Sequence, residues 1–140
     1  MATLNHIGIA VADLPEIKRL LALLGFSIDH TEDVPDQGVK THFIPMSRTN
    51  LELLEPTGEG AHGGAIGDYI KKHGPGIHHL AFGVPKGEFD ALCSQLKAEG
   101  YRLIYDTPRA GAQGARINFI HPASAGGMLI EIMEAAKKTE

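Results

Sequence analysis

Apolar residues along the chain follow two spacings, and each spacing predicts a different element. Two segments repeat apolar residues at intervals of three and four, which is typical of a helix with one buried face. The positions concerned are Ile17, Leu20, Leu21 and Leu24 in the first segment, and Phe89, Leu92, Cys93 and Leu96 in the second. Asp13 and Glu16 have capping-box spacing, which predicts where the first helix begins. Gly25 and Gly100 follow the two apolar stripes, and a glycine in that place favours a helix end.

Shorter apolar or alternating runs, bounded by proline and glycine, predict strands. They cover residues 5–11, 26–30, 38–45, 50–55, 78–84, 101–105, 115–121 and 128–134. A further short helix is expected from Ala65 to Lys72, stopped near Gly74.

The order of these elements repeats. Asn5-His6-Ile7-Gly8-Ile9-Ala10-Val11 matches His78-His79-Leu80-Ala81-Phe82-Gly83-Val84, and a helix follows each run. Leu51-Glu52-Leu53-Leu54-Glu55 then matches Ile130-Glu131-Ile132-Met133-Glu134 at the end of each copy. The sequence therefore predicts one domain over residues 1–140, built from two strand–helix–strand–strand–strand modules. The modules cover about residues 1–56 and 77–136, and residues 57–76 connect them.

Each module carries one histidine and one glutamate at matching places. Because successive side chains of a strand point to opposite faces, His6 shares its face with Gly8, and His79 shares its face with Ala81. Glu52 and Glu131 each lie inside an apolar strand, where a buried carboxylate needs a cation or several hydrogen bonds. Two histidines and two glutamates can surround one divalent metal ion, with Zn, Ni, Co, Mn and Fe all compatible with these ligands.

Composition narrows the function classes. The chain has 140 residues and a net charge of −4, without a basic cluster, which argues against a nucleic-acid partner. No apolar run is long enough to span a membrane, and no signal peptide is visible at the N-terminus. Cys93 is the single cysteine, which fits a reducing compartment. We therefore expect a cytoplasmic protein with no membrane partner.

The module order and the four ligand-type residues resemble the vicinal oxygen chelate superfamily, and within it the epimerases that act on methylmalonyl-CoA. The stretches that carry the resemblance are residues 5–10, 51–56, 76–82, 105–109, 114–122 and 126–131. The resemblance implies an α+β fold in which two βαβββ modules form an open curved barrel around one divalent metal. It implies His6, Glu52, His79 and Glu131 as the metal ligands, and a homodimer.

The implied reaction is epimerisation of methylmalonyl-CoA, or of a similar acyl-CoA thioester, through an enediolate. Moving a proton between two faces of a carbon requires acid–base groups on both sides, or one group with access to both. Glu131 is the candidate for one base. Several similar epimerases carry a second glutamate at the position of Thr41, whereas others lack it. Threonine is a poor base, and His42 is a weaker alternative. Arg116 and Asn118 are candidate substrate contacts, with a salt bridge and a strand-end hydrogen bond as the alternative roles.

Two other functions fit the same ligands or the same fold. The first is a glyoxalase I-type lactoylglutathione lyase, which shares the fold and, in some members, the ligand set. The turn before Glu131, His121-Pro122-Ala123-Ser124-Ala125-Gly126-Gly127, is more similar to the epimerases. The second is a metal-free small-molecule binding protein, against which the four intact ligand positions argue.

Overall fold

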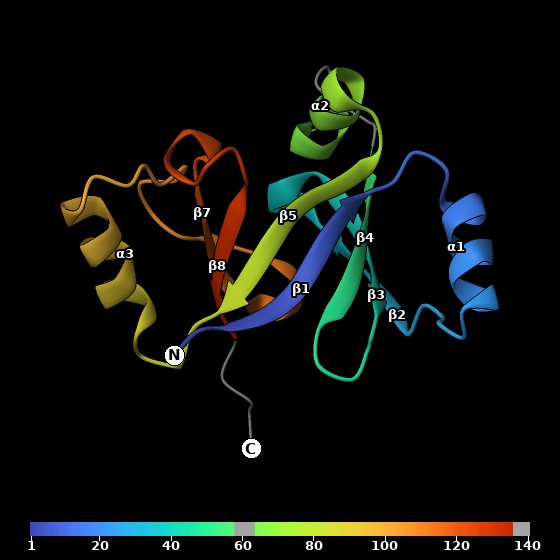
Figure 1. Cartoon of the computed structure of the whole chain (residues 1–140), viewed down its shortest axis with the longest axis horizontal. Coiled ribbons are helices and arrows are strands. Elements are labelled where there is room, and N and C mark those ends of the chain that lie inside the picture. The colour runs from blue at the N-terminus through green and yellow to red at the C-terminus, as the bar shows by residue number, and fades with distance from the viewer. Residues whose placement is uncertain (58–63, 136–140) are drawn as a thin grey trace. The chain divides into compact units, whose positions relative to one another are not determined.

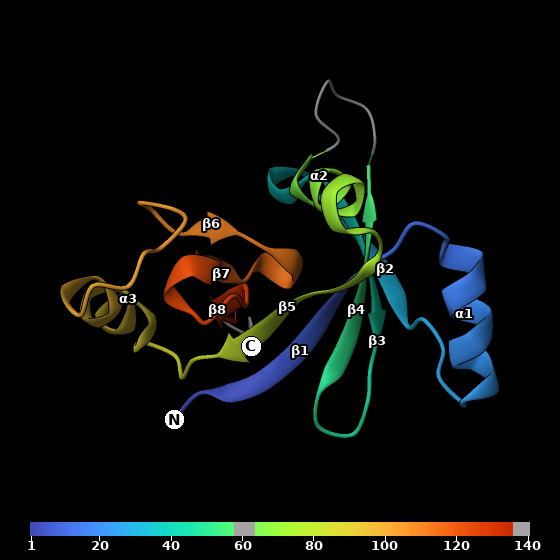
Figure 2. The same cartoon turned by 45° about the horizontal axis from the view of Figure 1, so that its top comes forward.

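The computed structural model describes residues 1–57 and 64–135 (Figures 1 and 2). It divides into two compact units. One unit runs from His6 to His78, and the other contains residues 1–5 together with the chain from His79 onward. The division falls close to the predicted connector at residues 57–76, of which residues 58–63 lie outside the described part, as does residue 136 at the end of the predicted second module. That the two modules form one domain stays a prediction.

The unit from His6 to His78 is a four-stranded sheet with two helices. Its strands lie in the order β2-β3-β4-β1, with β1 and β4 parallel and the other two pairings antiparallel. Its elements are β1 (Thr3–Ala10) from His6 onward, α1 (Leu14–Leu23), β2 (His30–Val34), a 3-10 turn (Pro35–Gln37), β3 (Val39–Ile44), β4 (Asn50–Pro56) and α2 (Gly64–His73). The helix predicted from Ala65 to Lys72 is confirmed as α2.

The second unit repeats this topology. Its strands lie in the order β5-β8-β7-β6, again with the first and last strand of the module parallel and the other pairs antiparallel. Its elements are β5 (Gly76–Gly83), α3 (Phe89–Ala98), β6 (Arg109–Ala110), a 3-10 turn (Ala112–Gly114), β7 (Arg116–Ile120), a second 3-10 turn (Pro122–Ser124) and β8 (Ile130–Glu134). Both predicted βαβββ modules are therefore present in the described residues.

Helix α1 begins as the sequence predicts, but it buries a narrower stripe. The Asp13 carboxylate accepts a hydrogen bond from the Glu16 backbone N–H at 3.1 Å, and Gly25 follows the helix end with a φ of +90°. Leu21 is buried against the sheet, whereas Leu20 and Leu24 are 53% and 64% exposed. The prediction that all four apolar positions face the core is wrong for these two leucines. Figure 1 shows α1, in blue, lying beside the strands β2–β4.

Helix α3 follows its predicted stripe closely. Phe89 is fully buried and Cys93 nearly so, and both pack against Ile132 of β8. Leu92 and Leu96 pack against the same cluster. Burial raises the pKa of the Cys93 thiol. The helix therefore covers one face of its sheet and leaves the other face to the side chains that alternate with Ile132.

Two predicted strands are wrong in extent. Of residues 26–30, only His30 belongs to a strand, because β2 begins there. Phe26 and Ile28 are instead half-buried in the core beside α1. The alternation of apolar residues here therefore reflects their burial and not a strand paired with a neighbour. Residues 101–105 form only an isolated bridge from Leu103 to Ile120.

Within the described residues, no helix is long and apolar enough to cross a membrane.

Candidate metal centre

The strand register places the same residues together in both units. Gly8 of β1 lies opposite Glu52 of β4, and Ala81 of β5 lies opposite Glu131 of β8. Residues opposite each other on neighbouring strands share a face of the sheet, and so do residues two apart on one strand. His6 therefore shares a face with Glu52, and His79 shares a face with Glu131. Each module brings together the histidine and the glutamate that the sequence analysis assigned to it.

His6 and Glu52 form a buried pair in the first unit. The His6 Nδ1 lies 2.5 Å from a carboxylate oxygen of Glu52, and the two residues are only 4% and 7% exposed. Gly8 and Ala10 line the same face and are also buried. Glycine has no side chain and alanine only a methyl group, so neither residue fills space beside the pair as a large residue would. The interpretation of β1 as a strand with its histidine on a small-residue face is confirmed.

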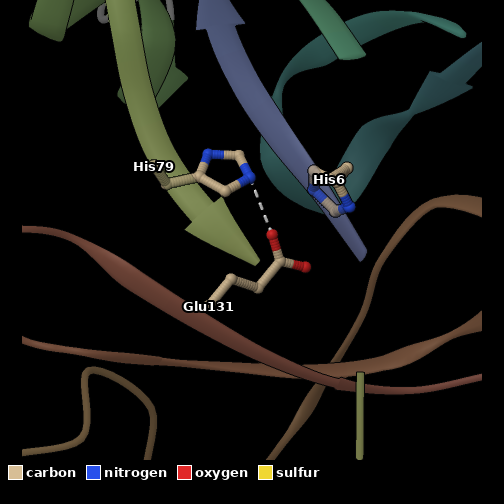
Figure 3. Close-up of side chains that lie close together, drawn as sticks. All are labelled: His6, His79 and Glu131. Atoms are coloured by element: carbon tan, nitrogen blue, oxygen red, sulfur yellow. Dashed lines mark ion pairs between the residues drawn. The ribbon is translucent and has the colours of Figure 1, made fainter. Parts of the chain in front are cut away.

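His79 and Glu131 form the equivalent pair in the second unit. Figure 3 shows the Glu131 carboxylate directed at the His79 ring, and the distance from its oxygen to His79 Nε2 is 2.8 Å. Both residues are 6% exposed. The Phe119 ring meets the His79 ring edge-on, with centroids 5.8 Å apart, and this contact restricts the orientation of the imidazole. The ion pair with Glu131 and the contact with Phe119 therefore together hold the orientation of the His79 ring.

The donor atoms of these pairs fit a divalent metal ion. Each unit buries a carboxylate whose partner is an imidazole nitrogen, and a buried carboxylate is costly without a cation or several hydrogen bonds. Imidazole nitrogen and carboxylate oxygen are common ligands of Zn, Ni, Co, Mn and Fe. The donor chemistry of His6, Glu52, His79 and Glu131 therefore agrees with the predicted ligand set.

Thr41 lies on the ligand face of the first unit, and His42 does not. Thr41 is opposite Leu54, two residues from Glu52 on β4, and it is 2% exposed. His42 is on the reverse face, where its Nδ1 is 2.8 Å from the Thr31 hydroxyl. Its Nε2 is 3.5 Å from a carboxylate oxygen of Glu55. His42 therefore contacts Thr31 and Glu55 on the reverse face, and Thr41 is the residue of the two that shares the face of Glu52.

Arg116 and Asn118 occupy the face that α3 covers, whereas Glu131 lies on the other face. Arg116 forms an ion pair with Asp90 on α3, and its guanidinium stacks over the Phe89 ring at 4.9 Å from the centroid. The hydrogen bond to Asp90 raises the pKa of the guanidinium. The salt bridge considered for Arg116 as an alternative is therefore present.

Asn118 is bound to the backbone of its own unit. Its amide nitrogen donates to the Tyr105 carbonyl at 3.0 Å, and its amide oxygen accepts from the Tyr105 N–H at 3.1 Å. These two bonds hold the segment that was predicted to be a strand at residues 101–105. Both side chains thus have internal partners on the face opposite Glu131, which favours the alternative roles given for them. A substrate contact of either residue stays a prediction.

Sequence reasoning did not single out Glu32, an acidic residue on the ligand face. It lies on β2 directly opposite Thr41. The predicted strand at residues 26–30 stopped before it, so it fell in a presumed turn. The hairpin closed by Val34 and Val39 was the available signal, because counting pairs back from that turn places Glu32 opposite Thr41.

The chain is similar to proteins of one family and to several epimerases. A family model described as "Glyoxalase/Bleomycin resistance protein/Dioxygenase superfamily" matches residues 5–119. The "Ethylmalonyl-CoA/methylmalonyl-CoA epimerase" of Cereibacter sphaeroides is 36% identical over 132 residues, covering 92% of this chain and 95% of the relative.

Solved structures agree with these matches. The methylmalonyl-CoA epimerase from Mycobacterium tuberculosis has 41% identity and a TM-score of 0.85, over 96% of this chain and 89% of that one. A methylmalonyl-CoA epimerase in complex with methylmalonyl-CoA and NH4+ has 36% identity and a TM-score of 0.84, over 97% and 96% of the two chains.

These matches bear on two predictions from the sequence. The fold class is confirmed, because solved epimerases align over nearly the whole chain. The relatives are also named as epimerases, in agreement with the enzyme class that the sequence predicts. By the extent of the family match and the identity to these relatives, the chain belongs to the Glyoxalase/Bleomycin resistance protein/Dioxygenase superfamily, the vicinal oxygen chelate group that its sequence resembles.

Proposed function

We propose that this protein is a metal-dependent epimerase of methylmalonyl-CoA or a similar acyl-CoA thioester. The observation that carries the proposal is the repeated, buried histidine–glutamate pair, His6 with Glu52 and His79 with Glu131. The relatives support the substrate class, because one is described in complex with methylmalonyl-CoA and another as acting on ethylmalonyl-CoA and methylmalonyl-CoA.

The four paired residues would together hold one divalent metal ion. His6 and Glu52 contribute the ligands of one module, and His79 and Glu131 those of the other. Co, Ni, Mn, Zn and Fe are all consistent with two imidazoles and two carboxylates. A bound divalent ion supplies Lewis-acid stabilisation of the negative charge that develops on the thioester oxygen.

Glu131 acts as an acid–base group in this proposal. Its carboxylate takes the α-proton from one epimer, the electron pair of the C–H bond moves to the thioester oxygen, and an enediolate-type intermediate results. An acid on the other side then gives a proton to the opposite face as the electron pair returns to the α-carbon, and exchange with water restores the Glu131 carboxylate. Residues around the pair, including Phe119, exclude water from the carboxylate and keep His79 in place.

Two alternatives have less support. The lactoylglutathione lyase and the metal-free binding protein share this superfamily, but the relatives described above are epimerases. The homodimer and the cytoplasmic location stay predictions, and size-exclusion chromatography with light scattering tests the first of them.

Exchange of the substrate α-proton tests the proposed function. Methylmalonyl-CoA is incubated in D2O with Co²⁺-loaded protein, and the α-proton signal is followed by NMR. We expect rapid enzyme-dependent loss of the signal, because proton abstraction precedes every inversion. The same protein after exhaustive chelation is the control. Absence of exchange with metal bound would contradict the proposal and favour another substrate, such as a hemithioacetal.

A further inference from the structure

Glu32 belongs to the same sheet face as the His6–Glu52 pair. The register runs across three strands: Glu32 lies opposite Thr41, and Thr41 lies opposite Leu54, two residues from Glu52 on β4. Since paired residues and residues two apart share a face, Glu32, Thr41 and Glu52 point to one side of the sheet. In the described strands β1–β4, Glu32 and Glu52 are the carboxylates on this side; the alternation places Asp33 and Glu55 on the other.

The burial of β2 agrees with this orientation. Glu32 is half-buried, whereas its neighbours Thr31 and Asp33 are exposed. Directly opposite side chains on adjacent antiparallel strands have Cβ atoms about 5 Å apart, which is the spacing between Glu32 and Thr41. Glu52 lies one strand further and two residues along β4. Thr41 is short and 2% exposed, so it fills little of the space above its own position. A glutamate on the next strand is long enough to extend over it toward Glu52.

The proposed epimerisation requires a second acid–base group. Inverting a carbon requires proton transfer at both of its faces, and one acid–base group rarely reaches both. Glu52 is assigned to the ligand set with His6, and a threonine hydroxyl remains protonated at neutral pH. Glu32 therefore offers a carboxylate on this face of the first unit that has no place in the ligand set.

We propose that Glu32 is the second acid–base residue of the epimerisation, in place of a base at position 41; this inference rests on the proposed function. The Glu32 carboxylate takes the α-proton of one epimer, and the electron pair of the C–H bond moves to the thioester oxygen. The protonated Glu131 then gives its proton to the opposite face of the α-carbon, and the electron pair returns from the oxygen to form the new C–H bond. Glu32 ends protonated and Glu131 ionised, and exchange with water or the reverse reaction restores the starting state.

Glu32→Gln tests the proposal, with Asp33→Asn as the matched control on the reverse face of the same strand. Single epimers are the substrates, and two rates are measured: conversion into the other epimer, and α-proton exchange in D2O by NMR. We expect Glu32→Gln to lower conversion at least 100-fold, in the range that general acid–base groups contribute. Exchange on the epimer whose proton faces Glu131 should continue, because that step does not use Glu32. Asp33→Asn should convert at the wild-type rate.

The position is tested further by placing a carboxylate at its neighbour. Thr41→Glu in the Glu32→Gln background should convert the substrate at least tenfold faster than Glu32→Gln alone. The new carboxylate lies on the same face, one strand closer to Glu52. Wild-type conversion in Glu32→Gln would overturn the role of Glu32, as would equal loss of exchange on both epimers at full metal content, or no recovery by Thr41→Glu. Absence of exchange in the wild-type protein would instead refute the proposed function itself, and the role of Glu32 with it.

Discussion

At the scale of single residues, the candidate site depends on which neighbours are small. Glu52 lies opposite Gly8, and Glu131 lies opposite Ala81. A larger side chain at either small position would occupy the space beside the glutamate, where a ligand has to approach. The pairing of one acidic and one small residue is thus as much part of the site as the histidines.

Glu131→Gln should abolish turnover while the protein still folds. Glutamine has nearly the same shape, so the buried position stays filled, but it cannot take a proton from the substrate. We expect conversion of methylmalonyl-CoA to fall at least about 100-fold. The measurement is the epimerisation rate at saturating Co²⁺, with circular dichroism to verify the fold.

The matched control for this change is Glu134→Gln on the same strand. The alternation of β8 puts Glu134 on the face of α3, where its carboxylate accepts a hydrogen bond from the Gly87 N–H at 2.8 Å. This variant should retain activity. Wild-type turnover in Glu131→Gln would remove Glu131 from the mechanism, whatever its place among the ligands.

The sheet faces of the ligand-type residues were predictable, because strand alternation is a strict geometric rule. Once the strands containing His6 and His79 are recognised, the period of two assigns their faces. The sequence analysis missed Glu32 because its strand has mostly polar residues and lies at the edge of its sheet, where apolar patterning is weak. For Asn118 the sequence left a substrate contact and a strand-end hydrogen bond open, because the chain pattern cannot show that its side chain bonds the backbone at Tyr105.

At the scale of elements, helix α1 shows which of its features follow from local sequence signals and which depend on packing. The start of α1 was predictable, because the capping bond between Asp13 and the Glu16 N–H is local. Its buried stripe was not fully predictable, because Leu20 and Leu24 have helical spacing yet stay exposed. Which side of a leucine-rich helix meets the sheet depends on the chain segments that follow, here Phe26 and Ile28.

Asp13→Ala should destabilise the protein by about 1 kcal/mol, the usual cost of losing an N-cap. The variant leaves the Glu16 N–H without its carboxylate partner. Urea unfolding followed by circular dichroism gives the free energy of unfolding. Asp106→Ala, at an exposed loop position, is the control and should change stability by less than about 0.5 kcal/mol. Equal effects of the two changes would show that the cap contributes nothing.

At the scale of the whole molecule, the repeat divides the predicted ligands between two units. The first unit contains His6 and Glu52, and the second contains His79 and Glu131. The register within each unit is the same, which explains why the sequence repeat alone predicted the module order. If one ion takes all four residues, neither unit can bind it fully without the other.

The proposed shared ion predicts one metal per chain and a joint effect on stability. Titration of the metal-free protein with Co²⁺, followed by calorimetry, should saturate at one ion per chain. At a free concentration one hundred times the Kd, the ion should add about 2.7 kcal/mol to the free energy of unfolding, because it binds only the folded chain. His6→Ala and His79→Ala should each lose most of this increment, since each removes a ligand from the same ion. Saturation at two ions per chain, or a half increment retained in each variant, would show instead that each histidine–glutamate pair binds its own metal.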